Sequence, residues 1–167
     1  MDTNNIIHPF PPLYNDNSDT LILGSFPSVK SRETMFFYGH PQNRFWKVIA
    51  GIYNDKLPLS IEEKKSIILN HNLALWDSIH SCTITGSSDS SVKNVAPNDI
   101  SGIINGSKIN RIFCNGTLSY TMYMKYIYPT TRLTAVKLPS TSPANAAYSL
   151  EKLVSEWISL NKCTMYN

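Results

Sequence analysis

Four short apolar runs, separated by segments with helical spacing, are the feature that most restricts the fold of this chain. They lie at residues 20–24 (TLILG), 73–79 (LALWDSI), 111–115 (RIFCN) and 132–139 (RLTAVKLP). Runs of this length, bounded by turn residues, predict buried strands. Because strands alternate with helices, the sequence predicts an α/β fold with three layers, α/β/α, around a central four-stranded, mostly parallel sheet.

Helix signals occupy the segments between these runs. Apolar residues recur at helical spacing over residues 45–53, where Phe45 and Trp46 are assigned to the core. Ser60 followed by Glu63 is a capping-box pattern for a helix to about residue 70. Three further helices are predicted over residues 98–105, 116–126 and 142–160, with Asn98, Gly116 and Ser142 at their starts. The Ser-, Gly- and Asn-rich stretch at residues 83–99 is predicted to be a loop.

The composition is typical of one globular domain, here residues 1–167, with 42% hydrophobic and 16% charged residues. Cys82, Cys114 and Cys163 are widely spaced, so neither a disulfide framework nor a zinc site is predicted, and a cytoplasmic location is expected. The chain shows no export signal and no apolar run long enough to cross a membrane. The formal charge of +3 allows a polyanionic partner without requiring one.

Two Pro- and Ser-rich loops follow predicted strands. The first loop, GSFPSVKSRE, covers residues 24–33, and the second loop, LPSTSPANA, covers residues 138–146. In open α/β sheets the ligand crevice lies beyond the carboxyl ends of the strands, so the two loops are expected to face each other across one cleft. Four basic residues and a single acid lie between residues 30 and 47, a bias that suits contact with phosphates or simply a solvated surface.

Several familiar chemistries lack their motifs. The four histidines have no HxxH or HExxH spacing, and GxSxG, GxGxxG and Walker patterns are absent, so no metal or other cofactor is expected. The two loops instead offer backbone N–H groups, hydroxyls, aromatic rings and the amides of Asn43 and Asn145. Fixed dipoles of this kind can promote hydrolysis of an N-glycosidic bond by stabilising an oxocarbenium-like sugar and a departing base anion.

Three segments together carry a resemblance to a known family: LILGSFPS, HPQNRFW and LPSTSPANA. In this ordered set the chain resembles the uracil-DNA glycosylase superfamily. HPQNRFWKVI is similar to a segment of the mismatch-specific uracil-DNA glycosylases. The longer stretches FPPLYNDNSDTLILGSFPSVKS and GSSDSSVKNVAPNDI are more similar to the hypoxanthine-DNA (deoxyinosine) glycosylase branch.

The chain departs from the wider superfamily at two positions. The usual water-orienting Asp or Asn of the first loop is replaced by Phe26, and the usual His or Asn of the second loop is replaced by Leu138. The resemblance to the hypoxanthine branch implies that the catalytic amide is Asn43, at the start of a helix whose N-terminus favours a developing anion. Asn43 could hold a water by its oxygen, donate to the base, or simply cap the helix.

The resemblance also implies a base pocket and a DNA-contacting surface. Phe36, Phe37 and Tyr38 form an aromatic run that no single face can bury, so at least one is expected in the pocket wall. His40 precedes Pro41 and is expected to orient the turn. The expected base pocket comprises Gly24, Ser25, Phe26, Pro27, Phe37, Tyr38 and His40. The expected DNA contacts are Ser28, Lys30, Ser31, Arg44, Ser140, Thr141, Ser142 and Asn145.

The function implied is a monomeric, monofunctional DNA glycosylase that flips a deaminated base, most simply hypoxanthine, out of double-stranded DNA and leaves an abasic site. Two alternatives remain open. One is broader excision of uracil or other bases from mismatches. The other is a nucleic-acid-binding module that has lost turnover. This alternative stays open because the usual polar catalytic residues are absent at positions 26 and 138.

Overall fold

Four parallel strands form the central sheet, in the order β3-β2-β6-β7. The computed structural model describes residues 5–164, in which these strands are β2 (Thr20–Gly24), β3 (Leu73–Asp77), β6 (Arg111–Asn115) and β7 (Ala135–Leu138). β2 lies between β3 and β6, and all of its residues are buried. The predicted four-stranded sheet is confirmed, and its strands are all parallel.

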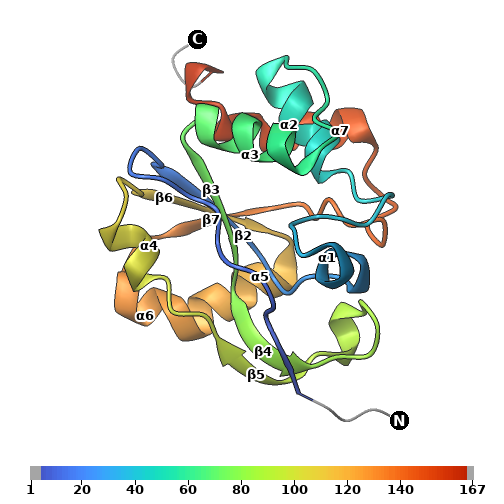
Figure 1. The fold of residues 1–167 in the computed structure, drawn as a ribbon, viewed down its shortest axis with the longest axis vertical. Coiled ribbons are helices and arrows are strands. Elements are labelled where there is room, and N and C mark those ends of the chain that lie inside the picture. Colours follow the sequence, from blue (N-terminus) through green and yellow to red (C-terminus); the bar gives the residue numbers. More distant parts are fainter. Residues whose placement is uncertain (1–4, 165–167) are drawn as a thin grey trace.

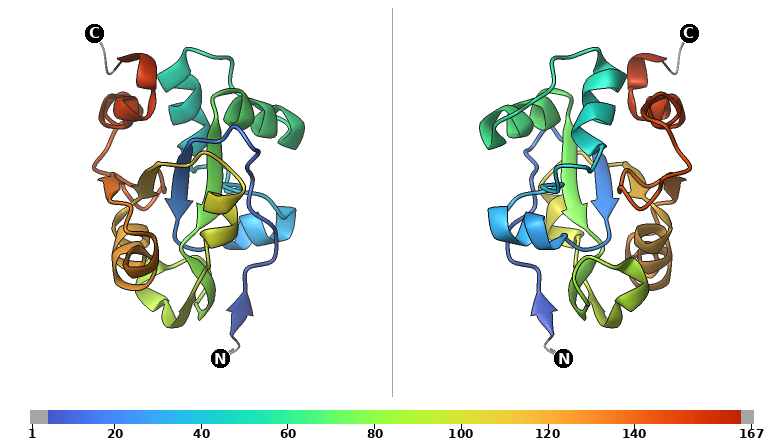
Figure 2. Two further views of the ribbon diagram at one scale, coloured as in Figure 1. Left: turned by 90° about the vertical axis from the view of Figure 1, so that its left-hand side faces the viewer. Right: turned by 90° about the vertical axis from the view of Figure 1, so that its right-hand side faces the viewer.

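Helices cover both faces of this sheet (Figures 1 and 2). On one side lie α2 (Phe45–Tyr53), α3 (Ile61–Asn70) and α7 (Leu150–Trp157). On the other side lie α4 (Ser101–Asn105), α5 (Thr117–Met122), a π-helical turn (Tyr123–Ile127) and α6 (Tyr128–Thr131). Two 3₁₀ turns, Ile158–Leu160 and Lys162–Thr164, follow α7. The arrangement confirms the predicted α/β/α layering.

The central sheet and its helices enclose a continuous apolar core. Phe45 is fully buried and Trp46 nearly so, as predicted, and Trp157 of α7 packs edge-on against Phe45. The predicted capping box is also present, because the Ser60 hydroxyl accepts a hydrogen bond from the Glu63 amide at 3.1 Å and opens α3. Local patterns therefore predicted these elements correctly.

A second, antiparallel sheet was not predicted. It consists of β1 (Ile6–Ile7), β4 (Ile79–Thr83) and β5 (Lys93–Pro97), in the order β1-β4-β5, and lies at the N-terminal end of the molecule (Figure 1). The single strand predicted over residues 73–79 is in fact two strands that break at Ser78, and the loop predicted over residues 83–99 contains β5 and a 3₁₀ turn, Asp89–Ser91. These strands depend on pairing between distant residues, which polar composition alone does not reveal.

Two predicted helix starts are wrong. Asn98 does not cap α4; its side chain instead donates to the carbonyls of Asp77 and Ile79 and ties the two sheets together. The last helix does not begin at Ser142, because α7 starts at Leu150 with Ser149 as its cap. Residues 142–148 form turns, and three of their carbonyls accept hydrogen bonds from a distant guanidinium, described below.

A short helix inside the first loop was also missed. α1 (Val29–Thr34) is capped by Ser28, whose hydroxyl accepts from the Ser31 amide at 3.1 Å. Parallel strands bring their carboxyl ends to one edge of a sheet. Residues at the ends of β2, β3, β6 and β7 therefore meet there, beside α1 and the start of α2.

Candidate active site

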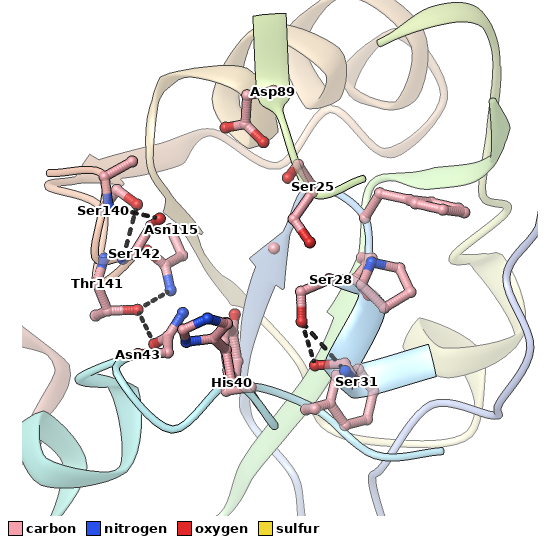
Figure 3. A pocket seen from close by; sticks show the side chains of 18 of the residues that line it. Ser25, Ser28, Ser31, His40, Asn43, Asp89, Asn115, Ser140, Thr141 and Ser142 are labelled. Atoms are coloured by element: carbon pink, nitrogen blue, oxygen red, sulfur yellow. Dashed lines mark hydrogen bonds between the residues drawn. The ribbon is translucent and has the colours of Figure 1, made fainter. Parts of the chain in front are cut away.

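A cavity of about 300 Å³ lies beyond the carboxyl ends of the four central strands. The first and second loops face each other across it, as the sequence predicted, with the start of α2 between them (Figure 3). Besides residues of the two loops, its wall includes Phe10, Asp77, Ile84, Ser87, Asp89 and Asn115. The site is thus assembled from segments far apart in the chain.

Most of the predicted site residues border this cavity. They are Gly24, Ser25, Phe26, Pro27, Ser28, Ser31, Phe37, Tyr38, His40, Asn43, Ser140, Thr141 and Ser142. Three predicted DNA-contacting residues do not line it: Lys30, Arg44 and Asn145. Lys30 lies 3.5 Å from Glu33 on the exposed face of α1, and the Asn145 side chain donates to the Ser140 carbonyl at 2.9 Å.

Asn43 is held by a chain of hydrogen bonds that crosses the cavity wall (Figure 3). Asn115 donates through Nδ2 to the Thr141 hydroxyl at 3.0 Å, and that hydroxyl donates to Asn43 Oδ1 at 2.9 Å. Asn115 also accepts from the Thr141 amide at 3.0 Å. Sequence reasoning missed Asn115, although its place as the last residue of a strand, before Gly116, was a usable signal.

The oxygen of the Asn43 side chain is fully used. Besides the Thr141 hydroxyl, Oδ1 accepts from the Phe45 amide at 2.9 Å, at the first residue of α2. A carbonyl oxygen has two lone pairs, so these two donors saturate it. Nδ2 of Asn43 has no hydrogen-bond partner within residues 5–164. The carboxamide is therefore fixed with its two N–H donors unused.

Arg44 holds the second loop. Its guanidinium donates to the carbonyls of Ser142 at 3.2 Å and Asn145 at 2.9 Å, and also to that of Tyr148. Two of these carbonyls also accept backbone amides in turns, from Asn145 to Ser142 and from Tyr148 to Asn145, so residues 142–148 form turns that precede α7. Contact between Arg44 and DNA stays a prediction, because the structure gives its side chain a loop-positioning role.

The two positions at which the chain departs from its superfamily differ in exposure. Leu138 is 4% exposed and packs in the core, so its side chain takes no part in the site. Phe26 borders the cavity, and its other side packs near Ile79 and Cys82 under the guanidinium of Arg32. Of the aromatic run, Phe37 and Tyr38 border the cavity, whereas Phe36 packs in the core against Trp46.

Two groups in the cavity wall have perturbed acidity. Burial, and then the nearby Asp77 carboxylate, raise the pKa of the Tyr38 phenol far above its ordinary value, so it stays protonated. Burial also raises the pKa of the Asp89 carboxyl. His40 Nδ1 accepts from the Gln42 amide at 3.1 Å, which fits the expected turn-orienting role.

No local pattern indicated that His8 would join this region. Its Nε2 lies 2.7 Å from Asp77 Oδ2, across 69 positions of the chain, and its side chain is almost completely buried. Asp77 is the last residue of β3, and a structural role was the favoured expectation for it.

No group of three or more His, Cys, Asp or Glu residues within residues 5–164 could hold a metal ion. None of the helices in that range is long and apolar enough to cross a membrane.

The sequence and the fold both match known proteins. The family model for the uracil DNA glycosylase superfamily matches residues 11–161. A hypoxanthine DNA glycosylase from Methanosarcina acetivorans is 34% identical over 152 residues, which are 89% of this chain and 93% of that protein. Another hypoxanthine DNA glycosylase, from Methanosarcina barkeri, is 30% identical over 93 residues, 55% of this chain and 59% of that protein.

Among solved structures, the solution NMR structure of a protein from Methanosarcina acetivorans, described as a candidate uracil DNA glycosylase, superposes with a TM-score of 0.80 at 29% identity. The match covers 94% of this chain and 98% of the other. Since the family model spans most of the chain and the fold agrees with it, this chain belongs to the uracil DNA glycosylase superfamily.

Proposed function

We propose that this protein is a DNA glycosylase that hydrolyses the N-glycosidic bond of deaminated bases in double-stranded DNA, prefers hypoxanthine, and leaves an abasic site. Its support is the family membership, the two relatives described as hypoxanthine DNA glycosylases, and the cavity. A base stacked in a duplex is out of reach of a cavity enclosed by two loops, so the base must be flipped out.

The orientation of Asn43 is the observation that carries the mechanism. When the glycosidic bond breaks, negative charge develops on the departing base. Because Oδ1 already accepts two hydrogen bonds, the side chain presents N–H donors and not an acceptor. Asn43 therefore donates to the base as it leaves, and the N-terminus of α2 adds positive potential at the same place. Holding a water by Oδ1 would require breaking one of the two bonds.

The hydroxyl-rich loops supply the contacts to the DNA backbone in this proposal. Ser28, Ser140 and Ser142 stand at the cavity with hydroxyls and backbone N–H groups that suit phosphate oxygens. Lys30, on the exposed face of α1, adds a positive charge. We further propose that the chain acts as one domain and a monomer, in the cytoplasm, with no cofactor.

Uracil is the second candidate substrate. The solved relative is described as a candidate uracil DNA glycosylase, and the superfamily carries that name. Both readings are tested with end-labelled duplexes that carry inosine, uracil, xanthine or a mismatch, incubated in EDTA and then treated with alkali to cut abasic sites. We expect the fastest single-turnover excision from inosine. If uracil were excised fastest, uracil would take the place of hypoxanthine as the preferred substrate. Binding without cleavage of any duplex would overturn the enzymatic function.

Substitution of Asn43 tests its role. Asn43→Ala should lower single-turnover excision of inosine by about a hundred- to a thousandfold, the usual effect of losing one transition-state donor. Asn43→Asp separates the two roles, because aspartate keeps the acceptor but lacks the N–H donors. We expect it to be as inactive as the alanine variant; high activity would instead support a water-holding role. Asn105→Ala, at an exposed position on α4, is the matched control and should keep wild-type activity.

A further inference from the structure

The cavity opens onto a second hollow of the surface. This groove, of about 760 Å³, is bordered by residues 87–90, the start of α5 and the second loop. Five residues line both the cavity and the groove: Ser87, Asp89, Ser140, Ser142 and Ala144. A flipped nucleotide keeps its sugar and phosphates outside the cavity that takes its base. The glycosidic bond therefore has to lie at this junction.

Asp89 is the only ionisable residue among those five. Its side chain reaches into the space on the side opposite Asn43 and His40 (Figure 3). No hydrogen bond or ion pair from residues 5–164 reaches its carboxylate oxygens. Solvent reaches the side chain, so the carboxylate is ionised near neutral pH even though partial burial raises its pKa. An unpaired negative charge thus stands where the reacting bond has to lie.

The segment that carries Asp89 is fastened to α1. The Ser87 hydroxyl accepts a hydrogen bond from the amide of Val29, the first residue of α1, at 3.0 Å. The Arg32 guanidinium donates to the Gly86 carbonyl at 2.9 Å. The carboxylate is therefore held at the junction by contacts that do not involve the carboxylate itself.

Neither stability nor DNA binding accounts for this carboxylate. It makes no contact that would stabilise the fold, and partial burial disfavours its charge. A negative charge beside the phosphates of a DNA strand weakens binding, because binding to DNA gains from positive charge. A role in the chemical step remains.

Hydrolysis needs an acceptor for a proton of the attacking water. Asn43 does not supply it, because its Oδ1 already accepts two hydrogen bonds. Asp77 is paired with His8 at 2.7 Å, and His40 lines the cavity but not the groove. Serine hydroxyls are poor proton acceptors at neutral pH. Asp89 is the carboxylate at the junction, with neither oxygen bound by residues 5–164.

We propose that the Asp89 carboxylate is the general base of the reaction: it orients a water at the junction and takes a proton from it. This inference rests on the proposed function. The water oxygen bonds to C1′ of the sugar as the bond from C1′ to the base breaks, and that electron pair leaves with the base. One proton of the water moves to Asp89, which releases it to solvent, and the base anion takes a proton from solvent. The carboxylate also stabilises the oxocarbenium-like sugar, while Asn43 stabilises the charge on the base.

Asp89→Asn tests this role, because the amide keeps the shape but neither the charge nor the proton acceptor. We expect single-turnover excision of inosine to fall about a hundredfold or more, the usual contribution of a general base. A 2′-fluoro substituent slows cleavage of the glycosidic bond, so a 2′-fluoro inosine duplex reports binding alone. The variant should bind this duplex as tightly as wild type or more tightly. Excision within about threefold of wild type, or an equal loss of affinity and excision, would overturn the proposal.

Asp16→Asn is the matched control. Asp16 is exposed and precedes β2, so it lies at the opposite ends of the strands from the cavity. Its substitution makes the same change in charge and should leave excision and affinity unchanged.

The pH dependence of excision gives a second readout. In wild type, excision should slow as the pH falls through the pKa of Asp89, because the protonated acid cannot accept a proton. The other titratable side chains that line the cavity or the groove are Tyr38, His40, Asp77, Lys137, Tyr148 and Glu156, and Arg32 binds the segment itself. The acidic limb should therefore be absent from Asp89→Asn and kept in His40→Gln, over the pH range in which all three proteins stay folded. An acidic limb that persists unchanged in Asp89→Asn would overturn the proposal.

Azide tests the same role by chemistry. It is an anionic nucleophile that needs no base, and Asp89→Ala leaves room for it. We expect azide to speed excision by Asp89→Ala about tenfold or more and to leave a 1-azido sugar in the DNA. Asn43→Ala lacks the donor to the leaving base and should not respond. Failure of azide to speed Asp89→Ala would overturn the general-base role.

Excision by wild type separates this inference from the proposed function. If wild type leaves every deaminated base attached, both are wrong. If wild type excises inosine and Asp89→Asn does so equally fast, only the general-base role of Asp89 is wrong.

Discussion

Two His–Asp pairs with nearly the same geometry occupy very different parts of this molecule. His8 and Asp77 lie 2.7 Å apart in the cavity wall, with side chains 1% and 7% exposed. His71 and Asp55 lie 2.6 Å apart on the surface, with side chains 27% and 43% exposed, and the His71 ring stacks on Tyr53. The pair itself is the same in both places, so its surroundings decide what it does.

On the surface, water solvates both partners and can replace either of them. In the cavity wall, the ring of His8 is the one hydrogen-bond partner that the carboxylate has among residues 5–164, and Asp77 itself borders the cavity. The comparison indicates that a polar group left unpartnered at the strand ends is part of the site, whereas the same group elsewhere is part of the solvated surface.

The largest expected effect comes from replacing the histidine of each pair. His8→Leu leaves a buried carboxylate unpaired and should lower the free energy of unfolding by about 3–5 kcal/mol. His71→Leu breaks an exposed pair and should cost less than about 1 kcal/mol. Urea denaturation at pH 7 measures both. Equal losses would show that burial does not distinguish the two pairs.

A double substitution is the control for this prediction. His8→Leu combined with Asp77→Leu removes both polar partners together and should regain most of the lost stability, since a buried pair and an apolar replacement are often equivalent. A double variant as unstable as His8→Leu would show that the loss does not come from an unpaired buried carboxylate.

The next effect concerns the hydrogen bonds that orient Asn43. Thr141→Val keeps the shape of a fully buried side chain but removes the hydroxyl between Asn115 and Asn43. It leaves a buried amide donor unpaired, so we expect a loss of about 1–3 kcal/mol in unfolding free energy and at least about a tenfold loss of excision.

Ser60→Ala is the control for Thr141→Val at a position away from the cavity. It removes the cap of α3 and should cost about 1 kcal/mol without changing excision of inosine. If both variants lost activity in proportion to stability, the hydrogen bonds around Asn43 would have no separate role. Denaturation and single-turnover assays at one temperature, where both variants stay folded, settle the point.

Local sequence patterns predicted most of the fold. The strands β2 and β6 and the helices α2 and α3 follow from short apolar runs, helical spacing and a capping box, all of which are visible within about ten residues. The meeting of the two loops also followed, because parallel strands end at one edge of a sheet. Thus the place of the cavity could be inferred from local patterns, whereas Asn43 was assigned from the resemblance to the hypoxanthine branch.

The residues that complete the site depend on contacts between distant segments. His8 reaches Asp77 through β1, a two-residue strand that pairs with β4, and neither element had a local signal. Asn115 belongs to the site because its neighbour β7 carries Thr141 to it. Arg44 binds three carbonyls of residues 142–148, a segment that forms turns where a helix was predicted. Tertiary contacts of this kind are not encoded in local periodicity.

The smallest expected effect compares two buried tyrosines. The Tyr38 hydroxyl is buried near Asp77 without a hydrogen-bond partner in the described chain, whereas the Tyr123 hydroxyl contacts Thr131 at 2.7 Å and the Leu133 carbonyl. Tyr38→Phe removes a buried polar atom that has no partner, so it should leave the unfolding free energy unchanged or raise it. Tyr123→Phe should cost about 1–2 kcal/mol, because it leaves its partners unsatisfied. Chemical denaturation of the two variants side by side measures the difference. If Tyr38→Phe lowered the unfolding free energy as much as Tyr123→Phe, the Tyr38 hydroxyl would have a hydrogen-bond partner in the protein without substrate. Hydrogen bonding at the strand ends would then be as complete as it is around Tyr123.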